Sequence, residues 1–330
     1  MAECPVTRLY VTIDTEYEFG FTRRLGPDSR AANFDRSIAC RTPAGDVGIG
    51  YQMDVLDRHG LKAVFFVDPM PALLWGKAAI EDVVGPIVAR GHDVQLHLHA
   101  EWLELAGTAN PLGARTGTNL KDFTLDEQCR LLDHARATLI AAGAAPPVAF
   151  RAGNYGANDD TLRALAMLGM RFESSHCPGY AASQCAITLG PQDRAPLCHC
   201  GVVEVPVGCI GAPGGGLRHA QLTAISARET IAALRHCAAH GIAGFTLVSH
   251  SFELLRRDRA GVNRIVRRRF ERLCAWLGAQ RGVTTATYAG DPPAPATGAA
   301  SATPVLPYRV LRTGLRMAEQ ALANALYGAR

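Results

Sequence analysis

The chain has 330 residues, of which 48% are hydrophobic and 19% charged, and its formal net charge is +4 at pH 7. This composition is typical of a folded globular protein and excludes an intrinsically disordered one. Arginine residues (31) far outnumber lysines (3), but so small a net charge does not indicate nucleic-acid binding, and we expect no nucleic-acid partner.

The N-terminal sequence MAECPVTRLYVTID runs directly into an apparent strand and contains no recognisable signal peptide. No stretch reaches the roughly 18 apolar residues that a membrane-spanning helix needs. The ten cysteines lack the spacing of a small disulfide framework. We therefore expect a cytoplasmic protein whose thiols are mostly reduced.

Short apolar or alternating runs predict strands, at residues 9–13, 63–67, 94–98, 148–150, 202–207, 245–248 and 283–287. Segments with helical spacing predict helices between them, at 51–58, 78–90, 125–142, 159–168, 227–239 and 264–277. This alternation favours a parallel sheet, and about seven such units favour a closed or nearly closed α/β barrel over a doubly wound open sheet. In a barrel of this kind the catalytic residues lie at the C-terminal ends of the strands.

Three segments stand outside this alternation. Residues 20–47, rich in Arg, Gly, Asp and Pro, predict a long loop after the first strand. Residues 290–304 have the Pro- and Ala-rich composition of a linker. We therefore expect a barrel at 1–289, a linker at 290–304 and an amphipathic C-terminal helix at 305–330.

The C-terminal segment repeats apolar residues at roughly helical spacing. Its apolar positions are Val310, Leu311, Leu315, Met317, Ala318, Leu322, Ala325 and Leu326, and its polar positions are Arg309, Arg312, Arg316 and Glu319. Two outcomes are open for such a stripe. It packs against the outer helices of the barrel, or it contacts a membrane surface or a partner, since arginine on the polar face suits anionic lipid.

Two predicted strands end in residues that suit a metal site. Asp14 and Glu16 stand on one face if the first strand continues, although a strand that merely ends in acidic loop residues is the alternative. His97 and His99 share a face of the third strand, close enough for both imidazoles to hold one ion. Two imidazoles and a carboxylate predict a divalent metal, most readily zinc, with a position left open for water.

Two further strand ends carry candidate catalytic groups. Arg151 starts a glycine-punctuated turn in which backbone groups at Asn154 and Tyr155 are candidates to face an oxyanion, unless the turn only leads into a helix. His250 follows the strand at 245–248 and is a natural general acid, although a lone histidine is more often structural. The run Cys198-His199-Cys200 lacks a second paired cluster, so we interpret it as structural.

The four strand ends TIDTE, HLHAEW, FRAGNYG and LVSHS, in this order, resemble the motif series of the polysaccharide deacetylase family, also called carbohydrate esterase family 4, whose catalytic unit is the NodB homology domain. The resemblance covers roughly residues 7–288. It implies a distorted (β/α) barrel whose members use a divalent metal to remove acetyl groups from N-acetylhexosamines or O-acetylated sugars.

The resemblance also implies roles for individual residues. Asp14 matches the general base, Arg151 the arginine that positions that base, His250 the histidine that protonates the leaving amine, and His97 the first metal histidine.

This sequence departs from the family pattern at the metal. Thr15 replaces the second of two adjacent aspartates, so Glu16 becomes the candidate third ligand. Glu101 replaces the usual second histidine, and we prefer His99 as its substitute, with Glu101 as the ligand if a helical turn begins at His97.

The expected function is thus metal-dependent deacetylation of an N-acetylated carbohydrate. The expected cytoplasmic location, with the inner face of the membrane as a second possibility, favours an intermediate of surface-glycan synthesis attached to a nucleotide or lipid carrier. Two alternatives remain open: an inactive barrel that binds a glycan or partner, and an amidohydrolase that acts on a non-sugar amide.

Overall fold

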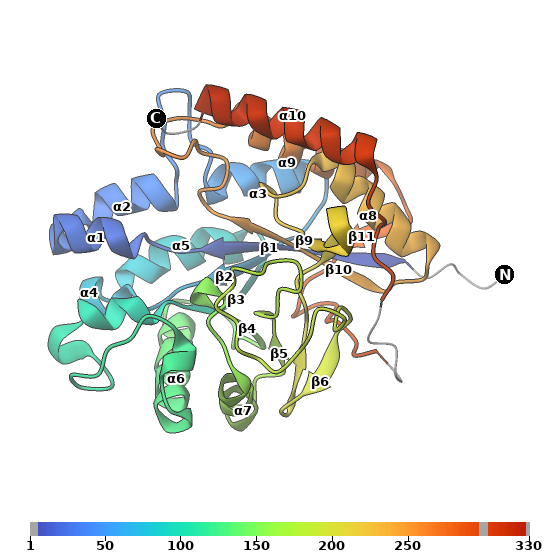
Figure 1. Ribbon diagram of the computed structural model, residues 1–330. Helices are drawn as coiled ribbons and strands as arrows, with labels where there is room; N and C mark the ends of the chain where they lie inside the picture. Colours follow the sequence, from blue (N-terminus) through green and yellow to red (C-terminus); the bar gives the residue numbers. More distant parts are fainter. Residues whose placement is uncertain (1–5, 297–302, 328–330) are drawn as a thin grey trace.

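The computed structural model describes residues 6–296 and 303–327. Its centre is a curled nine-stranded sheet with neighbours in the order β10-β1-β2-β3-β4-β5-β7-β6, and β11 pairs with the first residues of β1 (Figure 1). Every pairing in this sheet is parallel except that between β6 and β7. The strands that carry the predicted motifs are therefore neighbours that run in one direction.

The strands of the sheet are β1 (Thr7–Thr15), β2 (Val64–Val67), β3 (Asp93–Leu98), β4 (Ala149–Ala152), β5 (Phe172–Glu173), β6 (Leu197–His199), β7 (Val202–Glu204), β10 (Gly244–His250) and β11 (Val283–Thr285). A separate antiparallel hairpin consists of β8 (Cys209–Gly211) and β9 (Leu217–His219).

The helices cover the outside of the sheet (Figure 1). They are α1 (Phe19–Leu25), α2 (Arg30–Ser37), α3 (Ile49–Arg58), α4 (Ala72–Trp75), α5 (Ala78–Ala89), α6 (Leu125–Ala141), α7 (Asp159–Met167), α8 (Ala227–Ala239), α9 (Arg264–Ala279) and α10 (Val310–Tyr327). Capping boxes begin two of the long helices, Thr124 with Glu127 before α6 and Ser226 with Glu229 before α8. In each, side chains bond backbone N–H groups that the first helical turn leaves unpaired.

The sheet curls into a half-barrel, and among the described residues no strand ladder joins its two edges, β10 and β6. The chain after β7 bridges much of this gap. The Val207 N–H donates to the His176 carbonyl at 2.9 Å, and the Gly208 N–H donates to the Thr246 carbonyl of β10, also at 2.9 Å. The predicted distorted α/β barrel with a C-terminal helix is thus confirmed in half-barrel form, rather than as a closed ladder of about seven strands.

Side chains alternate between the two faces of the sheet, as the period of a strand requires. In β2, Phe65 and Val67 belong to the large core beneath the outer helices, whereas Val64 and Phe66 belong to a smaller cluster inside the curl. Tyr10 and Tyr288 fill the same inner cluster and are almost completely buried. The interior is therefore packed and supports the site at the end of the strands.

The prediction of a long loop at 20–47 is wrong, because this segment contains most of α1 and all of α2. A buried side chain, Asn33, connects the two helices: its amide donates to the Glu18 carbonyl at 2.9 Å and to the Thr22 hydroxyl at 2.8 Å. Such tertiary bonds stabilise helices too short to be stable alone. Strands β6, β8 and β9 were not predicted, since runs of three residues show no periodicity.

The C-terminal helix α10 lies over α8 and α9 with its polar side inward (Figure 1). Glu319 pairs with Arg269 of α9 at 2.6 Å, and Arg316 lies 3.3 Å from Glu229 of α8. The large apolar side chains of α10 are nevertheless exposed, for example Leu311 at 78% and Leu322 at 53%. The apolar stripe is therefore not buried against the outer helices, which was the first of the two outcomes predicted for it.

None of the helices in the described part of the chain is both long and apolar enough to cross a bilayer. Residues 297–302 of the predicted linker lie outside the described residues, and the division into barrel, linker and helix stays a prediction.

Candidate active site

The candidate residues come together at the C-terminal end of the sheet. The strand register sets Asp14 of β1 beside His250 of β10, and His97 of β3 beside Arg151 of β4. A cavity of about 700 Å³ opens here, and the side chains of Asp14, Glu16, His97, His99, Asn154, Tyr155 and His250 line it. Arg151 lies beneath it and is completely buried. Parallel strands thus bring distant motifs to one site, as expected for this class of fold.

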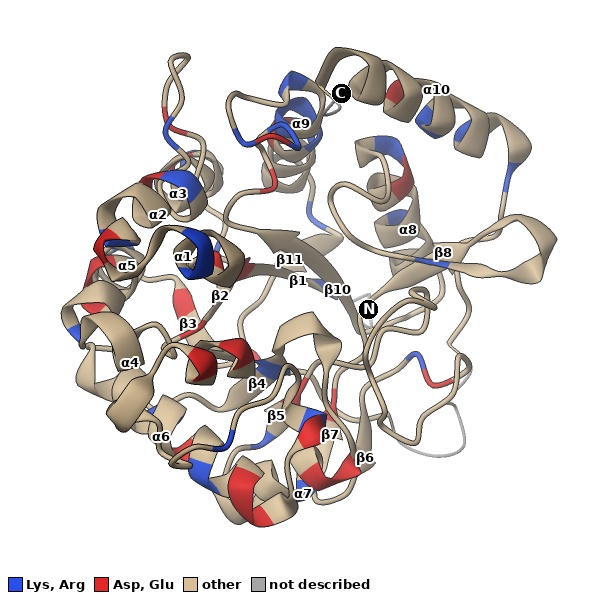
Figure 2. Cartoon of the chain, turned by 60° about the vertical axis from the view of Figure 1, so that its left-hand side comes forward, with Lys and Arg blue, Asp and Glu red and all other residues tan. Residues whose placement is uncertain are grey.

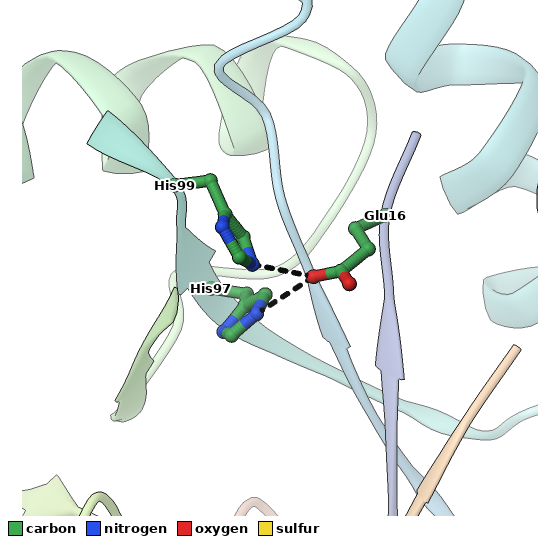
Figure 3. A group of neighbouring side chains, drawn as sticks. All are labelled: Glu16, His97 and His99. Carbon is green, nitrogen blue, oxygen red and sulfur yellow. Dashed lines mark hydrogen bonds and ion pairs between the residues drawn. The ribbon is translucent and has the colours of Figure 1, made fainter. Parts of the chain in front are cut away.

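Glu16, His97 and His99 form a cluster whose ligand atoms all lie within 4.8 Å of one another (Figure 3). Glu16 Oε2 lies 3.1 Å from His97 Nε2 and 2.6 Å from His99 Nε2. Two ligand atoms that share a tetrahedral zinc at 2.0–2.1 Å are about 3.3 Å apart. The donor atoms therefore already have nearly the separations that one ion requires.

The Nδ1 atom of each imidazole also lies close to a hydrogen-bond acceptor. His97 Nδ1 lies 2.7 Å from the backbone carbonyl of Arg151, and His99 Nδ1 lies 3.1 Å from a carboxylate oxygen of Glu101. A proton on Nδ1 that donates to these acceptors leaves the Nε2 lone pair for a metal, an arrangement common around metal-binding histidines. Glu101 thus orients His99 and lies outside the three-residue cluster, which favours His99 over Glu101 as a ligand.

Burial raises the pKa of Glu16, but the adjacent His99 and His97 outweigh it and hold that pKa well below its ordinary value. Glu16 is therefore an ionised carboxylate, the form in which a carboxylate binds metal. Asp68, just after β2, is 1% exposed, and one of its oxygens has no hydrogen-bond partner within the described structure. Burial raises the pKa of Asp68 to about 6, although His99 and His97 oppose the shift.

Asp14 and Arg151 form a buried ion pair, 2.7 Å from Arg151 Nη1 to Asp14 Oδ1, with side chains 5% and 0% exposed. The guanidinium also donates to the Thr12 hydroxyl at 2.9 Å and to the Ser174 carbonyl at 3.0 Å, and it lies 4.4 Å from the centre of the Phe66 ring. Asp14 is therefore fixed in position on the floor of the cavity.

His250 lies between two carboxylates. Its Nε2 is 3.9 Å from Asp14 Oδ2 and its Nδ1 is 3.9 Å from Glu253 Oε1. Burial lowers the pKa of His250, but Glu253 and Asp14 outweigh this effect and raise it to about 9. Glu253 in turn accepts hydrogen bonds from Gln221 at 2.5 Å and Thr223 at 2.7 Å. His250 is thus protonated at neutral pH and partly open to the cavity.

The turn after β4 has an uncommon backbone conformation, because Asn154 and Tyr155 have φ values of 56° and 57°. Consecutive residues in the left-handed region orient their backbone groups toward one side, as anion-binding turns do. Position 153, just before them, requires glycine, because a Cβ atom there would lie only 2.7 Å from the His99 ring. The turn therefore packs directly against the His99 ring.

The run Cys198-His199-Cys200 does not assemble as one ligand set. His199 Nε2 lies 3.1 Å from Asp159 Oδ1, and Cys200 joins this pair as a second possible ligand group, whereas Cys198 is exposed. Asp159 also accepts bonds from the Thr188 amide and hydroxyl, at 2.9 and 2.6 Å, so this carboxylate is already satisfied by protein donors.

Several residues around the cavity were not predicted. Glu253 had a sequence signal, because it follows His250 by three residues in SHSFE. Tyr180, Arg218, Gln221 and Gln320 come from loops, the hairpin and the C-terminal helix, and no local motif surrounds them. They line the cavity only because tertiary contacts bring these segments over the end of the sheet.

No family model and no curated protein matches the sequence. Among solved structures, a Mycobacterium smegmatis protein described as a putative polysaccharide deacetylase is similar at a TM-score of 0.56 and 20% identity, over 88% of this chain and 90% of that one. A 4-alpha-glucanotransferase of Thermococcus litoralis reaches a TM-score of 0.51 at 9% identity, over 86% of this chain and 40% of that one.

A family 4 carbohydrate esterase of Streptomyces lividans is also found, at a TM-score of 0.42 and 10% identity, over 86% of this chain and 93% of that one. Identities this low show a fold and no more, and one fold can support different reactions. The chain therefore has the half-barrel fold of the M. smegmatis protein described as a putative polysaccharide deacetylase.

Proposed function

We propose that the protein belongs to the polysaccharide deacetylase family and is a metal-dependent hydrolase that removes an acetyl group from an N-acetylated sugar. One observation carries this proposal: a possible metal cluster, a buried Asp–Arg pair and a protonated histidine share a single cavity. These are the parts that amide hydrolysis requires, namely water activation, a base and an acid.

Glu16, His97 and His99 would hold the ion, and zinc suits their two imidazoles and one carboxylate. A divalent ion bound there would make water more acidic and polarise the acetyl carbonyl.

Asp14 acts as the base and accepts the proton of the water molecule that adds to the acetyl carbon. Arg151 is the positioning residue, because its ion pair at 2.7 Å orients the Asp14 carboxylate. Backbone N–H groups at Asn154 and Tyr155 are the proposed donors to the oxyanion that forms.

His250 then gives its proton to the sugar nitrogen as the carbon–nitrogen bond breaks, which releases acetate and a free amine. Its pKa of about 9 keeps it protonated until this step. Asp14 passes the proton that it took from water back to solvent or to His250, and the site returns to its starting state.

We propose as the substrate an intracellular intermediate of surface-glycan synthesis. An O-acetylated sugar, a non-sugar amide and an inactive, glycan-binding barrel are the competing possibilities. A single experiment distinguishes these possibilities from the proposed function.

The experiment measures acetate released from N-acetylhexosamines, an O-acetylated sugar and a simple acetanilide, by the zinc-loaded protein and by its His250→Gln variant. The matched control is His240→Gln, an exposed histidine at the end of α8. We expect acetate from the N-acetylated sugar, loss in His250→Gln and full activity in the control. Acetate from none of the substrates would favour the inactive barrel.

A further inference from the structure

The C-terminal helix α10 forms part of the active-site cavity. Arg316 and Gln320 of α10 line it together with Arg218 of β9 and with Asp14 and His250. The lining therefore combines two chemically different groups of side chains. One group holds the candidate metal and the base, and the other carries two guanidinium groups.

Among residues 6–296 and 303–327, no carboxylate forms an ion pair with Arg218, and the Arg218 side chain is only partly exposed. Burial and the neighbouring Arg316 both lower the pKa of Arg218, although Glu229 opposes them. A half-buried cation beside a second cation is unfavourable unless an anion joins them.

Arg316 is only partly neutralised. Its side chain is 9% exposed, and its Nε lies 3.3 Å from Glu229 Oε1. The other oxygen of Glu229 is already occupied, because it accepts from the Ser226 amide at 2.9 Å and the Ser226 hydroxyl at 3.0 Å to cap α8. One carboxylate thus faces two guanidinium groups, and this wall of the cavity keeps an excess positive charge.

We propose that Arg218 and Arg316 bind an anionic group of the substrate, a phosphate or a carboxylate, while the acetyl group lies at Glu16, His97 and His99. This inference rests on the proposed deacetylase function and names its substrate class. Guanidinium groups form paired hydrogen bonds with phosphate and carboxylate oxygens, and inside a cavity such bonds are stronger than on an open surface.

The test compares three substrates: the neutral methyl glycoside of an N-acetylhexosamine, the N-acetylhexosamine with a phosphate at C1, and the methyl glycoside with a carboxylate at C6. We expect kcat/KM to be about tenfold or more higher for at least one anionic substrate than for the neutral one, because only an anionic substrate forms charge-assisted hydrogen bonds with the guanidinium groups. Arg218→Gln should remove this preference through KM and leave the neutral substrate unchanged. Arg218→Lys should restore part of it.

The matched control is Arg228→Gln, an exposed arginine of α8 that does not line this cavity. Equal kcat/KM for all three substrates, or a preference that survives in Arg218→Gln, would overturn the inference. Hydrolysis of none of them would instead overturn the proposed function. The activity of Arg218→Gln on the neutral glycoside shows whether the variant is folded.

The outer side of α10 is apolar and exposed. Leu311, Leu315, Leu322 and Leu326 lie on one side of the helix, and their exposed fractions are 78%, 46%, 53% and 56%. So many exposed leucines on a single helix are unusual for a monomeric surface and mark a contact site.

Arginines surround this apolar side. A groove of about 800 Å³ between α10, α8 and α9 is lined by Leu311, Leu315 and Leu322 together with the exposed Arg228, Arg268, Arg272 and Arg309. Figure 2 shows basic segments on all three helices. Within the described part of the chain, Glu319 is the one acidic residue that lines the groove, and it is paired with Arg269.

We infer that this face docks onto an anionic lipid surface. Leucines flanked by arginines are the composition of helices that lie in the bilayer interface, where the apolar side inserts and the cations contact headgroups. A second copy of the chain is a poorer occupant, because two such faces would bring like charges together.

The test is cosedimentation of the full chain with vesicles of phosphatidylglycerol and phosphatidylcholine or of phosphatidylcholine alone. We expect binding to the anionic vesicles only, weakened by salt, and at least tenfold weaker in Leu311→Ser/Leu322→Ser. The control is Met167→Ser on α7, a side chain that is 70% exposed. Equal binding to both vesicles, equal binding by the double variant, or concentration-dependent dimers in place of binding would overturn the inference.

Discussion

At the scale of single residues, the stability of the fold depends more on Asp14, the proposed base, than on His250, the proposed acid. Asp14 is 5% exposed at its side chain and forms a buried ion pair with Arg151, whereas His250 is 23% exposed and lies 3.9 Å from its nearest carboxylates. Removing one partner of a buried pair leaves the other charge uncompensated. Replacing His250 should therefore affect activity with less change in stability than replacing Asp14.

We expect His250→Gln to lower kcat by about 10² or more, the usual effect of losing a general acid, with Tm nearly unchanged. Asp14→Asn should lower kcat and also destabilise the protein by about 3–5 kcal/mol, because Arg151 stays buried without its anion. Kinetics and thermal unfolding of both variants measure this. Wild-type turnover in either one would remove that residue from the mechanism.

The activity should also depend on pH through His250. Glu253 and Asp14 raise the pKa of His250 above its ordinary value to about 9, so the protonated, active form persists at neutral pH and is lost as pH rises through about 9. Replacing Glu253 by Gln removes the adjacent negative charge, so the alkaline limb of the kcat profile should move to lower pH. An alkaline limb at the same pH in Glu253→Gln would contradict this assignment.

Substitutions can distinguish a proposed metal ligand, His99, from Glu101, which orients its ring. We expect His99→Ala to lose most of the bound ion, while Glu101→Gln keeps it with an affinity about 10–100-fold lower, because Glu101 only orients the His99 ring. Metal content after dialysis against a weak chelator measures the difference. Full content in His99→Ala together with loss in Glu101→Gln would make Glu101 the ligand.

The sequence predicted the residues that lie at the ends of long strands, because strand direction and period bring them together. Glu16, His97 and His99 are of this kind, and the structure places their ligand atoms within 4.8 Å. Arg218 and Arg316 could not be predicted. Their position depends on how a hairpin and a terminal helix fold back over the sheet, and the spacing of a single segment carries no information about that.

At the scale of elements, α10 shows that amphipathic spacing predicts a helix without predicting which side is buried. The inward side carries Arg316, and Glu319 pairs with α9, so ion pairs help to attach this helix while its leucines stay exposed. Short elements are hard to predict for another reason, because they are stable only within the complete fold. β5, with two residues, forms only within the complete sheet, and α1 and α2 need the bonds of Asn33.

Deleting residues 304–330 tests the role of this helix. We expect the shortened protein to keep its metal content and its activity on the neutral glycoside, because Glu16, His97, His99, Asp14 and His250 all precede the deletion. It should lose preference for anionic substrates and binding to anionic vesicles. A deletion that changes neither substrate preference nor vesicle binding would show that α10 has no such role.

At the scale of the whole molecule, the fold alone does not specify the reaction. Structures described as a putative polysaccharide deacetylase and as a glucanotransferase both align with most of this chain. The function therefore has to be argued from the C-terminal edge of the sheet, where four separate strands contribute to one cavity. The cavity and the basic, apolar face of α10 adjoin each other, which suits a substrate that carries an anionic group close to a lipid surface.

The most direct test of this account is acetate release from an N-acetylated sugar by the native chain before and after metal removal. We expect activity to disappear with the chelated ion and to return in proportion to zinc, up to one ion per chain. Acetate release that is unaffected by chelation would contradict the metal site. A chain that binds one ion and releases no acetate from any N-acetylated sugar would contradict the deacetylase.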